Sequence, residues 1–398
     1  MGERFPSRGQ FPQGLGVPGG GTPLSRVWVF VHDCLIIGGG VIGLSVAWEL
    51  SRHGLSCAVL DQQAFGQESS WAGAGMLPPG NPAKAETCEE RLRSHSHVLW
   101  PEWTAALREA SGIDNGFRRD SAIEVRFGGE PGELDDEIRR WHSTGVACQP
   151  LTAAEARGLE PALGPGITSA YLLPEHGQVR NPRHVKALQA ACAGAGVTLL
   201  PGTPVWEIVR QGGRVTRVET PAGGFSAGQY VVASGAWSER LLAPLGNAPW
   251  VRPLRGQMVL LSQLPCPLGR VINLGHRYLV PRGDGRVLVG STEEDVGFDR
   301  RNTAEGVYGL LELARQVVPA MAQGTLERTW AGLRPRSIDG QPYLGRWPGL
   351  ENLIVATGHH RAGLQLSPIT AVLVGELVRG QEPRVDLHGF RPDRVGSD

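Results

Sequence analysis

Three glycines near the start of the chain form the pattern Gly38-x-Gly40-x-x-Gly43, which follows an apolar run over residues 34–37. The first glycine permits a tight turn, the second lets the backbone approach a pyrophosphate, and the third lets helix and strand pack closely. The following helix offers free N–H groups to the phosphates. Asp61 closes the next apolar run, where its carboxylate can accept hydrogen bonds from a ribose diol and would repel a 2′-phosphate. The pattern therefore predicts a site for FAD or NAD and disfavours NADP.

Short apolar runs place this motif in a βαβ unit. Residues 34–37 and 57–60 are predicted strands, and apolar residues between 41 and 50 recur at helical spacing. Much later, residues 230–233 and 353–356 are predicted to be buried strands, and each is soon followed by a glycine. A helix with one apolar face is expected after the second of them. These pieces predict a Rossmann-type parallel sheet assembled from distant parts of the chain.

The segments between these pieces have a different pattern. Residues 277–280 and 286–289 are predicted strands joined by Gly283-Asp284-Gly285, a hairpin signal. Residues 115–125 and 253–261 also have the composition of strands. We therefore expect an α/β chain (α+β overall), in which a β-rich antiparallel substrate domain interrupts the nucleotide-binding domain. The expected boundaries are a disordered extension over 1–30, a discontinuous nucleotide-binding domain over 31–114, 166–245 and 326–385, and a substrate-binding domain over 115–165 and 246–325.

Charge and cysteine content narrow the class of protein. The chain of 398 residues has 39 basic and 39 acidic residues, so no global field favours nucleic acid or an anionic membrane. Its 6 cysteines include no CxxC pair, which argues against a disulfide framework or a zinc site and favours a reducing compartment. No apolar stretch is long enough for a transmembrane helix. We expect a cytoplasmic protein that binds neither nucleic acid nor membrane.

Five further motifs carry a family resemblance. They are Gln67–Met76, which is rich in small residues, Tyr278-Leu279-Val280-Pro281-Arg282, Gly290-Ser291-Thr292, Gly332-Leu333-Arg334-Pro335, and Gly358-His359-His360-Arg361-Ala362-Gly363. In this order they resemble the D-amino-acid oxidase family of FAD-dependent oxidoreductases, and within it the glycine oxidase branch linked to thiamine biosynthesis. The resemblance runs from about residue 33 to about residue 379. It implies that the nucleotide is FAD and that the nucleotide-binding domain is an FAD-binding domain.

The resemblance assigns three residues to the substrate. Arg334 matches the arginine that binds the substrate carboxylate, a role that suits the rigid fork of a guanidinium. Tyr278 lies in the hairpin that resembles the active-site lid, with its hydroxyl available as a second donor, or alternatively packs on the core. His276 shares the strand face of Tyr278 and resembles a pocket-lining position, although an exposed polar role suits it equally.

The resemblance also implies which residues hold FAD. They are Gly38, Gly40, Val41, Ile42, Gly43, Asp61, Gln62, Ser69, Ser70, Ala72, Gly73, Gly75, Met76, Val205, Gly235, Gly358, His359, Arg361, Ala362, Gly363 and Leu364. Relatives with covalent flavin use a late cysteine or a histidine after the loop tryptophan. Here no cysteine follows Cys266 and Ala72 follows Trp71, so we expect non-covalent FAD.

The implied reaction is oxidation of glycine or another small amino acid by hydride transfer to flavin N5, with dioxygen as acceptor and hydrogen peroxide as product. A D-amino-acid dehydrogenase that passes electrons to a quinone or carrier is the alternative. Glu293 and Glu294 stand where some relatives carry an apolar pocket residue. An acidic side chain there would face solvent or recognise a cationic substrate, which leaves the identity of the amino acid open. A homo-oligomer is compatible with the sequence.

Overall fold

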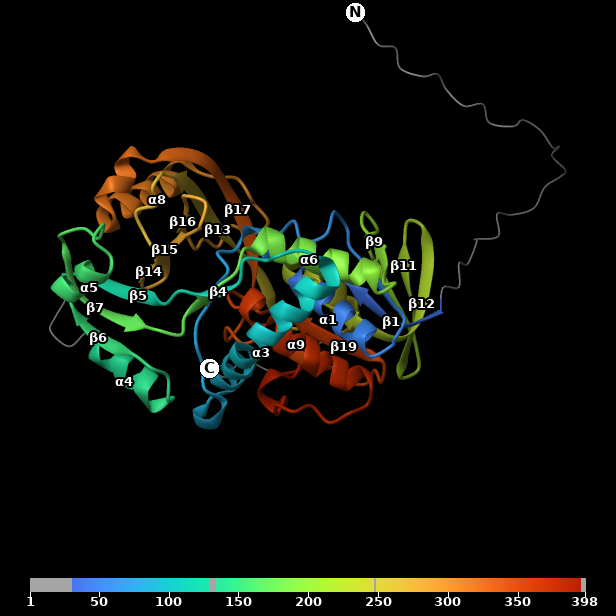
Figure 1. Cartoon of the computed structure of the whole chain (residues 1–398). Coiled ribbons are helices and arrows are strands. Elements are labelled where there is room, and N and C mark those ends of the chain that lie inside the picture. The colour runs from blue at the N-terminus through green and yellow to red at the C-terminus, as the bar shows by residue number, and fades with distance from the viewer. Residues whose placement is uncertain (1–30, 129–133, 247, 395–398) are drawn as a thin grey trace, which may run out of the picture.

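The computed structural model describes residues 31–128, 134–246 and 248–394, and the predicted extension over 1–30 lies outside these residues. Within the described chain the elements form two lobes, each organised around one large sheet (Figure 1). A small third sheet joins β3 (Met76–Leu77), β8 (Gly177–Gln178) and β4 (Arg118–Arg119). The expected architecture, a Rossmann-type lobe interrupted by a mainly antiparallel one, is confirmed.

The first large sheet has a parallel centre. Its parallel strands are β9 (Thr198–Leu200), β2 (Cys57–Leu60), β1 (Val31–Ile37), β12 (Gly223–Val232) and β19 (Leu353–Thr357), in that spatial order. The hairpin β10 (Glu207–Gln211) and β11 (Arg214–Thr220) extends the sheet beside the first half of β12, and β18 (Tyr343–Arg346) pairs antiparallel with β19. The strand order reverses at β1. In such sheets ligands bind beyond the carboxyl ends of the strands at this reversal, which is where the glycine motif lies.

Four helices lie together beside this sheet in Figure 1: α1 (Val41–Arg52), α3 (Cys88–Ser111), α6 (Asn181–Gly194) and α9 (Gly363–Val378), with α3 packed on α6 and α9. α1 is buried from Val41 to Leu50 because it packs between the sheet, α6 and α9. Thr87 and Glu90 form a capping box at the start of α3, and Gly112 ends it in the left-handed conformation. Shorter helices are α2 (Ser69–Ala72) and α7 (Ser238–Leu242).

The second large sheet is antiparallel except for one parallel pair, β14 with β5. Its order is β17 (Thr325–Ser337), β13 (Val251–Ser262), β16 (Arg286–Gly290), β15 (Arg277–Pro281), β14 (Val271–Leu274), β5 (Ala122–Phe127), β7 (Ile167–Leu173) and β6 (Gln149–Thr152). The helices α4 (Asp135–Ser143), α5 (Ala153–Leu159) and α8 (Ala304–Val317) belong to this lobe. Strands β7 and β17 pair within this sheet, whereas the sequence analysis assigned residues 166–245 and 326–385 to the other domain. By their strand pairing, β7 and β17 therefore belong to the antiparallel lobe and not to the nucleotide-binding domain in which the sequence analysis placed them.

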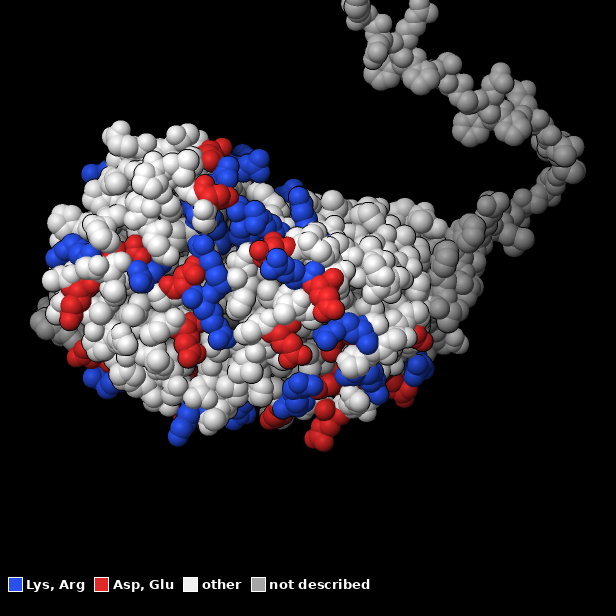
Figure 2. Space-filling view, viewed as in Figure 1, with Lys and Arg blue, Asp and Glu red and all other residues white. Residues whose placement is uncertain are grey.

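The remaining expectations concern absences. Among the described residues, no helix is long and apolar enough to cross a membrane, and no group of side chains is arranged to hold a metal ion. All six cysteines are free thiols. On the face seen in Figure 2, basic and acidic side chains are mixed, with a gathering of basic ones near β4. This face presents no extended field of one sign.

A buried histidine makes stability depend on pH. The imidazole of His184 is fully buried, and burial lowers its pKa to about 3, below about 6.5 for an unfolded chain. Between these values the unfolded chain binds a proton that the folded chain does not. The contribution of His184 to the free energy of unfolding is therefore fully present above about pH 6.5 and is lost progressively as the pH decreases. We expect His184→Gln to remove up to ~1.4 kcal/mol per pH unit of this dependence. Urea unfolding at pH 7.5, 6 and 5 gives the free energy of unfolding at each pH. If this free energy changed equally with pH in the variant and in wild type, the prediction would be contradicted.

Candidate active site

A single cavity of about 910 Å³ extends from the glycine motif of the first lobe to the strands of the second. Asp61, Gly40 and Val205 line one end, and Tyr278 and Arg334 line the other. Of the residues assigned to FAD or substrate from the sequence, all but Gly43 and Gly358 lie on its wall. The fold thus brings together residues from both lobes at one site.

The glycine motif is held by close backbone contacts. Gly38 has φ +111°, and a Cβ there would lie 2.4 Å from the carbonyl oxygen of Ala233, the residue after β12. A Cβ on Gly43 would lie 1.9 Å from the carbonyl oxygen of Gly38. Gly43 therefore acts by letting α1 pack against the turn, not by lining the cavity. A Cβ on Gly40 would meet only the Oγ of Ser70, at 3.1 Å.

Two polar side chains fix the entrance to α1. The backbone N–H of Gly39 donates to Asp61 Oδ2 at 2.7 Å, and that of Gln63 donates to Asp61 Oδ1 at 2.9 Å. Burial raises the pKa of Asp61, and these two hydrogen bonds oppose the rise. The N–H of Val41 donates to Ser70 Oγ at 2.9 Å. A carboxylate beside a helix N-terminus, framed by glycines, suits a ribose and pyrophosphate.

The small-residue loop is anchored from the second lobe. Arg282 is buried and donates to the carbonyl oxygen of Ala74 at 2.7 Å and to Gln178 Oε1 at 2.7 Å. Burial lowers the pKa of Arg282 to about 9. A Cβ on Gly75 would lie 1.9 Å from the carbonyl oxygen of Val179, so this position accepts only glycine without movement of the backbone. The loop backbone is therefore fixed where it lines the cavity.

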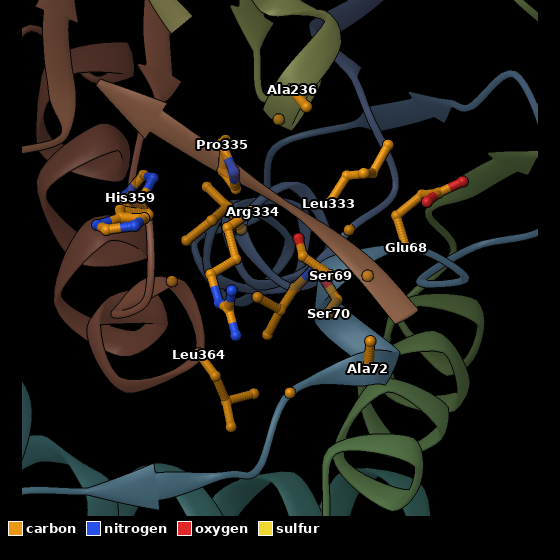
Figure 3. Close-up of a pocket in the computed structure, with 18 of the residues that line it drawn as sticks. Glu68, Ser69, Ser70, Ala72, Ala236, Leu333, Arg334, Pro335, His359 and Leu364 are labelled. Carbon is orange, nitrogen blue, oxygen red and sulfur yellow. The ribbon is translucent and has the colours of Figure 1, made fainter. Parts of the chain in front are cut away.

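Arg334 projects from β17 into the space between α2 and the start of α9, as Figure 3 shows. Its guanidinium donates to the carbonyl oxygen of Thr292 at 3.2 Å and to Ser291 Oγ at 2.5 Å. Both acceptors are neutral, and no carboxylate of the described residues forms an ion pair with it. A Cβ on Gly256 would lie 2.2 Å from Arg334 Nη2, so this glycine leaves room for the guanidinium. The arrangement presents an uncompensated cation to the cavity.

Tyr278 lies across a glycine on the neighbouring strand. It pairs with Gly290 in the register of β15 and β16, and a Cβ on Gly290 would lie 2.6 Å from the Tyr278 ring. The hydroxyl lies 3.5 Å from Met258 Sδ, a weak acceptor, and the ring is half-buried. The hydroxyl therefore retains its capacity to donate to a bound carboxylate.

The residues at the outer wall are bound to one another. Arg361 forms an ion pair with Glu293 and donates to His276 Nδ1 at 2.8 Å. Glu294 forms an ion pair with Arg255 and accepts from Gln257 Nε2 at 2.8 Å. Glu293 is exposed, which is one of the two alternatives expected for these glutamates, and it also pairs with Arg361, whereas Glu294 is half-buried and pairs with Arg255.

Two neighbouring histidines are neutral. The His359 imidazole is buried and lies 3.1 Å from Thr370 Oγ1, and burial lowers its pKa to about 3. Burial, followed by the charges of Arg334, Arg336 and His276, lowers the pKa of His360 to about 4. At neutral pH His360 therefore adds no positive charge beside Arg334.

Sequence reasoning missed the residues that hold Arg334. Ser291 and Thr292 were recognised only as part of a motif, and Gly256 was not singled out. An isolated glycine within a predicted strand signals a close approach, and this signal could have marked Gly256. No signal in the sequence indicates that Glu293 pairs with Arg361.

Comparison with known proteins connects this geometry to a family. Residues 33–377 match the DAO family, described as FAD dependent oxidoreductase. The glycine oxidase of Pseudomonas putida is 36% identical over 367 residues, which cover 91% of this chain and 99% of that protein. The bifunctional protein ThiO/ThiG of Synechocystis sp. is 37% identical over 369 residues, which cover 91% of this chain and 54% of that protein. The crystal structure of glycine oxidase from Geobacillus kaustophilus superposes with a TM-score of 0.88 at 35% identity, covering 92% and 99% of the two chains.

Proposed function

The chain belongs to the DAO family of FAD-dependent oxidoreductases, and from this membership and the cavity we propose that it oxidises glycine or another small amino acid. FAD is its cofactor, and the enzyme class is an FAD-dependent amino-acid oxidase. Bound FAD would supply the two-electron oxidant: the substrate would give up a hydride from Cα and a proton from its nitrogen to form an imine, and dioxygen would be reduced to hydrogen peroxide. The imino acid hydrolyses to an oxo acid and ammonia.

The observation that carries the proposal is the uncompensated guanidinium of Arg334. A buried or half-buried arginine is normally paired with a carboxylate, because desolvated charge is costly without a partner. Here Ser291 and Thr292 orient the guanidinium, and its charge remains available to a ligand. A small α-amino acid supplies the missing carboxylate, and Tyr278 is placed to donate a second hydrogen bond.

The protein's own residues orient the substrate and tune its surroundings. With the carboxylate fixed by Arg334, the substrate Cα is held in one position relative to the flavin site. The entropy cost of orienting the reactants is then met on binding and not during the reaction. Neutral His360 leaves the electrostatic attraction centred on Arg334. The N-terminus of α9 begins at Gly363 on the cavity wall, and its dipole would stabilise negative charge on a reduced flavin ring.

The glycine end of the cavity fits the nucleotide part of non-covalent FAD. Gly38 and Gly40 line the cavity with bare backbone, and Asp61 follows β2 at its carboxyl end. We place the FAD-binding domain on the parallel sheet and the substrate domain on the antiparallel sheet, with β7 and β17 counted in the latter. The six free thiols support a cytoplasmic location, and the ThiO/ThiG relative supports a role in the thiazole step of thiamine synthesis.

Absorbance of the purified protein before and after anaerobic addition of glycine tests the function. A flavin spectrum that bleaches with glycine and returns with air, with release of peroxide, is the expected result. A spectrum that bleaches but returns only with an artificial dye would replace the oxidase by a dehydrogenase. A flavin that no small amino acid bleaches would reject the proposal.

Gly256 offers a test of the carboxylate site that leaves Arg334 unchanged. We expect Gly256→Ala to push the guanidinium aside, because the flexible end of Arg334 gives way more easily than backbone. KM for glycine should rise by roughly tenfold, which corresponds to ~1.4 kcal/mol of lost binding. Steady-state kinetics measure it, with thermal unfolding to show that the fold is kept. A KM within twofold of wild type would show that the guanidinium is not confined by this glycine.

A further inference from the structure

We propose that Glu293 is a specificity-determining residue, which keeps Arg361 from binding a second anionic group of the substrate. The site would then prefer amino acids that carry a single carboxylate. This inference rests on the proposed function and names the substrate class of the same cavity. Glu293 acts through Arg361, so it is a positioning residue and not a catalytic one.

The two arginines near the substrate end of the cavity differ in their partners. Arg361 and Arg334 both line the cavity. Arg334 is bound to neutral oxygens only, whereas Arg361 forms an ion pair with Glu293 and donates to His276. Glu293 is not itself on the cavity wall. The guanidinium of Arg334 is therefore available to an anion, whereas that of Arg361 is neutralised by Glu293, which lies off the cavity wall.

The guanidinium groups of Arg334 and Arg361 face one shared cavity. His360 Nε2 lies 3.8 Å from Glu293 Oε1, and His360 lines the cavity together with Arg334 and Arg361. Tyr278 lines the same cavity as the two arginines. A substrate held on Arg334 would extend its nitrogen substituent or side chain toward this outer wall.

The chemistry follows from the charges. A second carboxylate on the substrate would approach Arg361 and meet the carboxylate of Glu293 at the same guanidinium, so attraction and repulsion nearly cancel. Removing the charge of Glu293 would leave a rigid, planar donor that matches a carboxylate. Both side chains are about one-third exposed, at 36% for Arg361 and 35% for Glu293, so solvent screens the effect. We expect a change of about threefold to fivefold.

The test compares two N-substituted glycines that differ in one charge: iminodiacetate and its monoamide. Each would lose a hydride from Cα and a proton from its nitrogen to give an imine, and the flavin would be reduced by two electrons. Single-turnover bleaching of the anaerobic holoenzyme gives Kd for each compound, and no glycine released by hydrolysis adds to the signal. The proteins are wild type, Glu293→Gln, the double variant Glu293→Gln with Arg361→Met, and Glu312→Gln. Glu312 is the matched control because it also pairs with an arginine, Arg315, on a helix that does not line the cavity.

We expect Glu293→Gln to favour iminodiacetate over the monoamide by about threefold to fivefold relative to wild type, and the double variant to lose this gain. An unchanged ratio in Glu293→Gln would overturn the inference. A gain that persists in the double variant would also overturn it, because repulsion by Glu293 alone would then explain the selectivity. Glu293→Met repeats the test if the glutamine variant does not fold.

Failure of the proposed oxidase function can be distinguished from failure of the inference about Glu293. If no amino acid bleaches the wild-type flavin, the oxidase assignment fails on that result alone. Perturbation of the oxidised flavin spectrum by iminodiacetate and by its monoamide still gives two dissociation constants in each protein. The inference about Glu293 stands or falls on their ratio.

Discussion

Replacing Arg334 by methionine should raise KM for glycine at least about thirtyfold while FAD stays bound. Methionine keeps much of the length of the side chain but removes every donor, so the substrate carboxylate would be left beside Ser291 and Thr292 without a counter-charge. Loss of one partner of a hydrogen-bonded charge pair typically costs ~2–5 kcal/mol, and each 1.4 kcal/mol is a factor of ten. Steady-state oxygen consumption against glycine concentration measures the effect, and the absorbance ratio of flavin to protein measures FAD content.

Arg286→Met is the matched control for this variant. Arg286 lies on β16 of the same sheet, pairs with Glu327 and does not line the cavity. KM in this control should stay close to the wild-type value. An unchanged KM in Arg334→Met would remove Arg334 from the substrate site and with it the observation on which the proposed function depends.

Adding a single methyl group at Gly43 should weaken FAD binding by at least about fivefold. The new Cβ would lie 1.9 Å from the carbonyl oxygen of Gly38, so either α1 or the phosphate-binding turn must move. Overpacking of this kind costs ~1–3 kcal/mol, and here the strain falls on the backbone that approaches the pyrophosphate. Fluorescence titration of the apoprotein with FAD gives Kd, and urea unfolding gives the loss of stability.

Gly309→Ala separates this effect from helix propensity. Gly309 lies inside α8, and a Cβ there would meet no atom within 4 Å. Alanine favours a helix over glycine by ~1 kcal/mol at both positions, so Gly309→Ala should be as stable as wild type or more stable. If Gly43→Ala bound FAD as tightly as wild type, the close approach of α1 to the turn would not be needed for the cofactor.

The sequence predicted the local parts of the nucleotide site because their physics is local. The turn at Gly38, the helix that follows it and Asp61 at the end of β2 lie within one βαβ unit. The spacing of apolar residues predicts the strand and the helix. Glycine is needed where the backbone adopts a positive φ, or where a neighbouring backbone lies too close for a side chain. The structure places these elements where the pattern predicted them.

Domain boundaries were less predictable because a strand alone does not show which sheet it joins. β7 was expected in the nucleotide-binding domain, yet it pairs with β5 and β6 of the second sheet. β17 likewise pairs with β13 along nearly its whole length. Both strands are buried in part and have ordinary β composition, so only the partner strand decides their lobe.

From the amino-acid sequence we could identify the glycine motif, the acidic residue that follows it, the apolar runs and the family likeness that points to FAD. The tertiary structure decided which charges at the substrate end remain free. Arg334 reaches Ser291 and Thr292 because β17, β13 and β16 lie side by side in one register, and Glu293 neutralises Arg361 because a strand end meets the start of α9. Such pairings depend on contacts between residues far apart in the chain, and neither spacing nor residue type specifies them in advance.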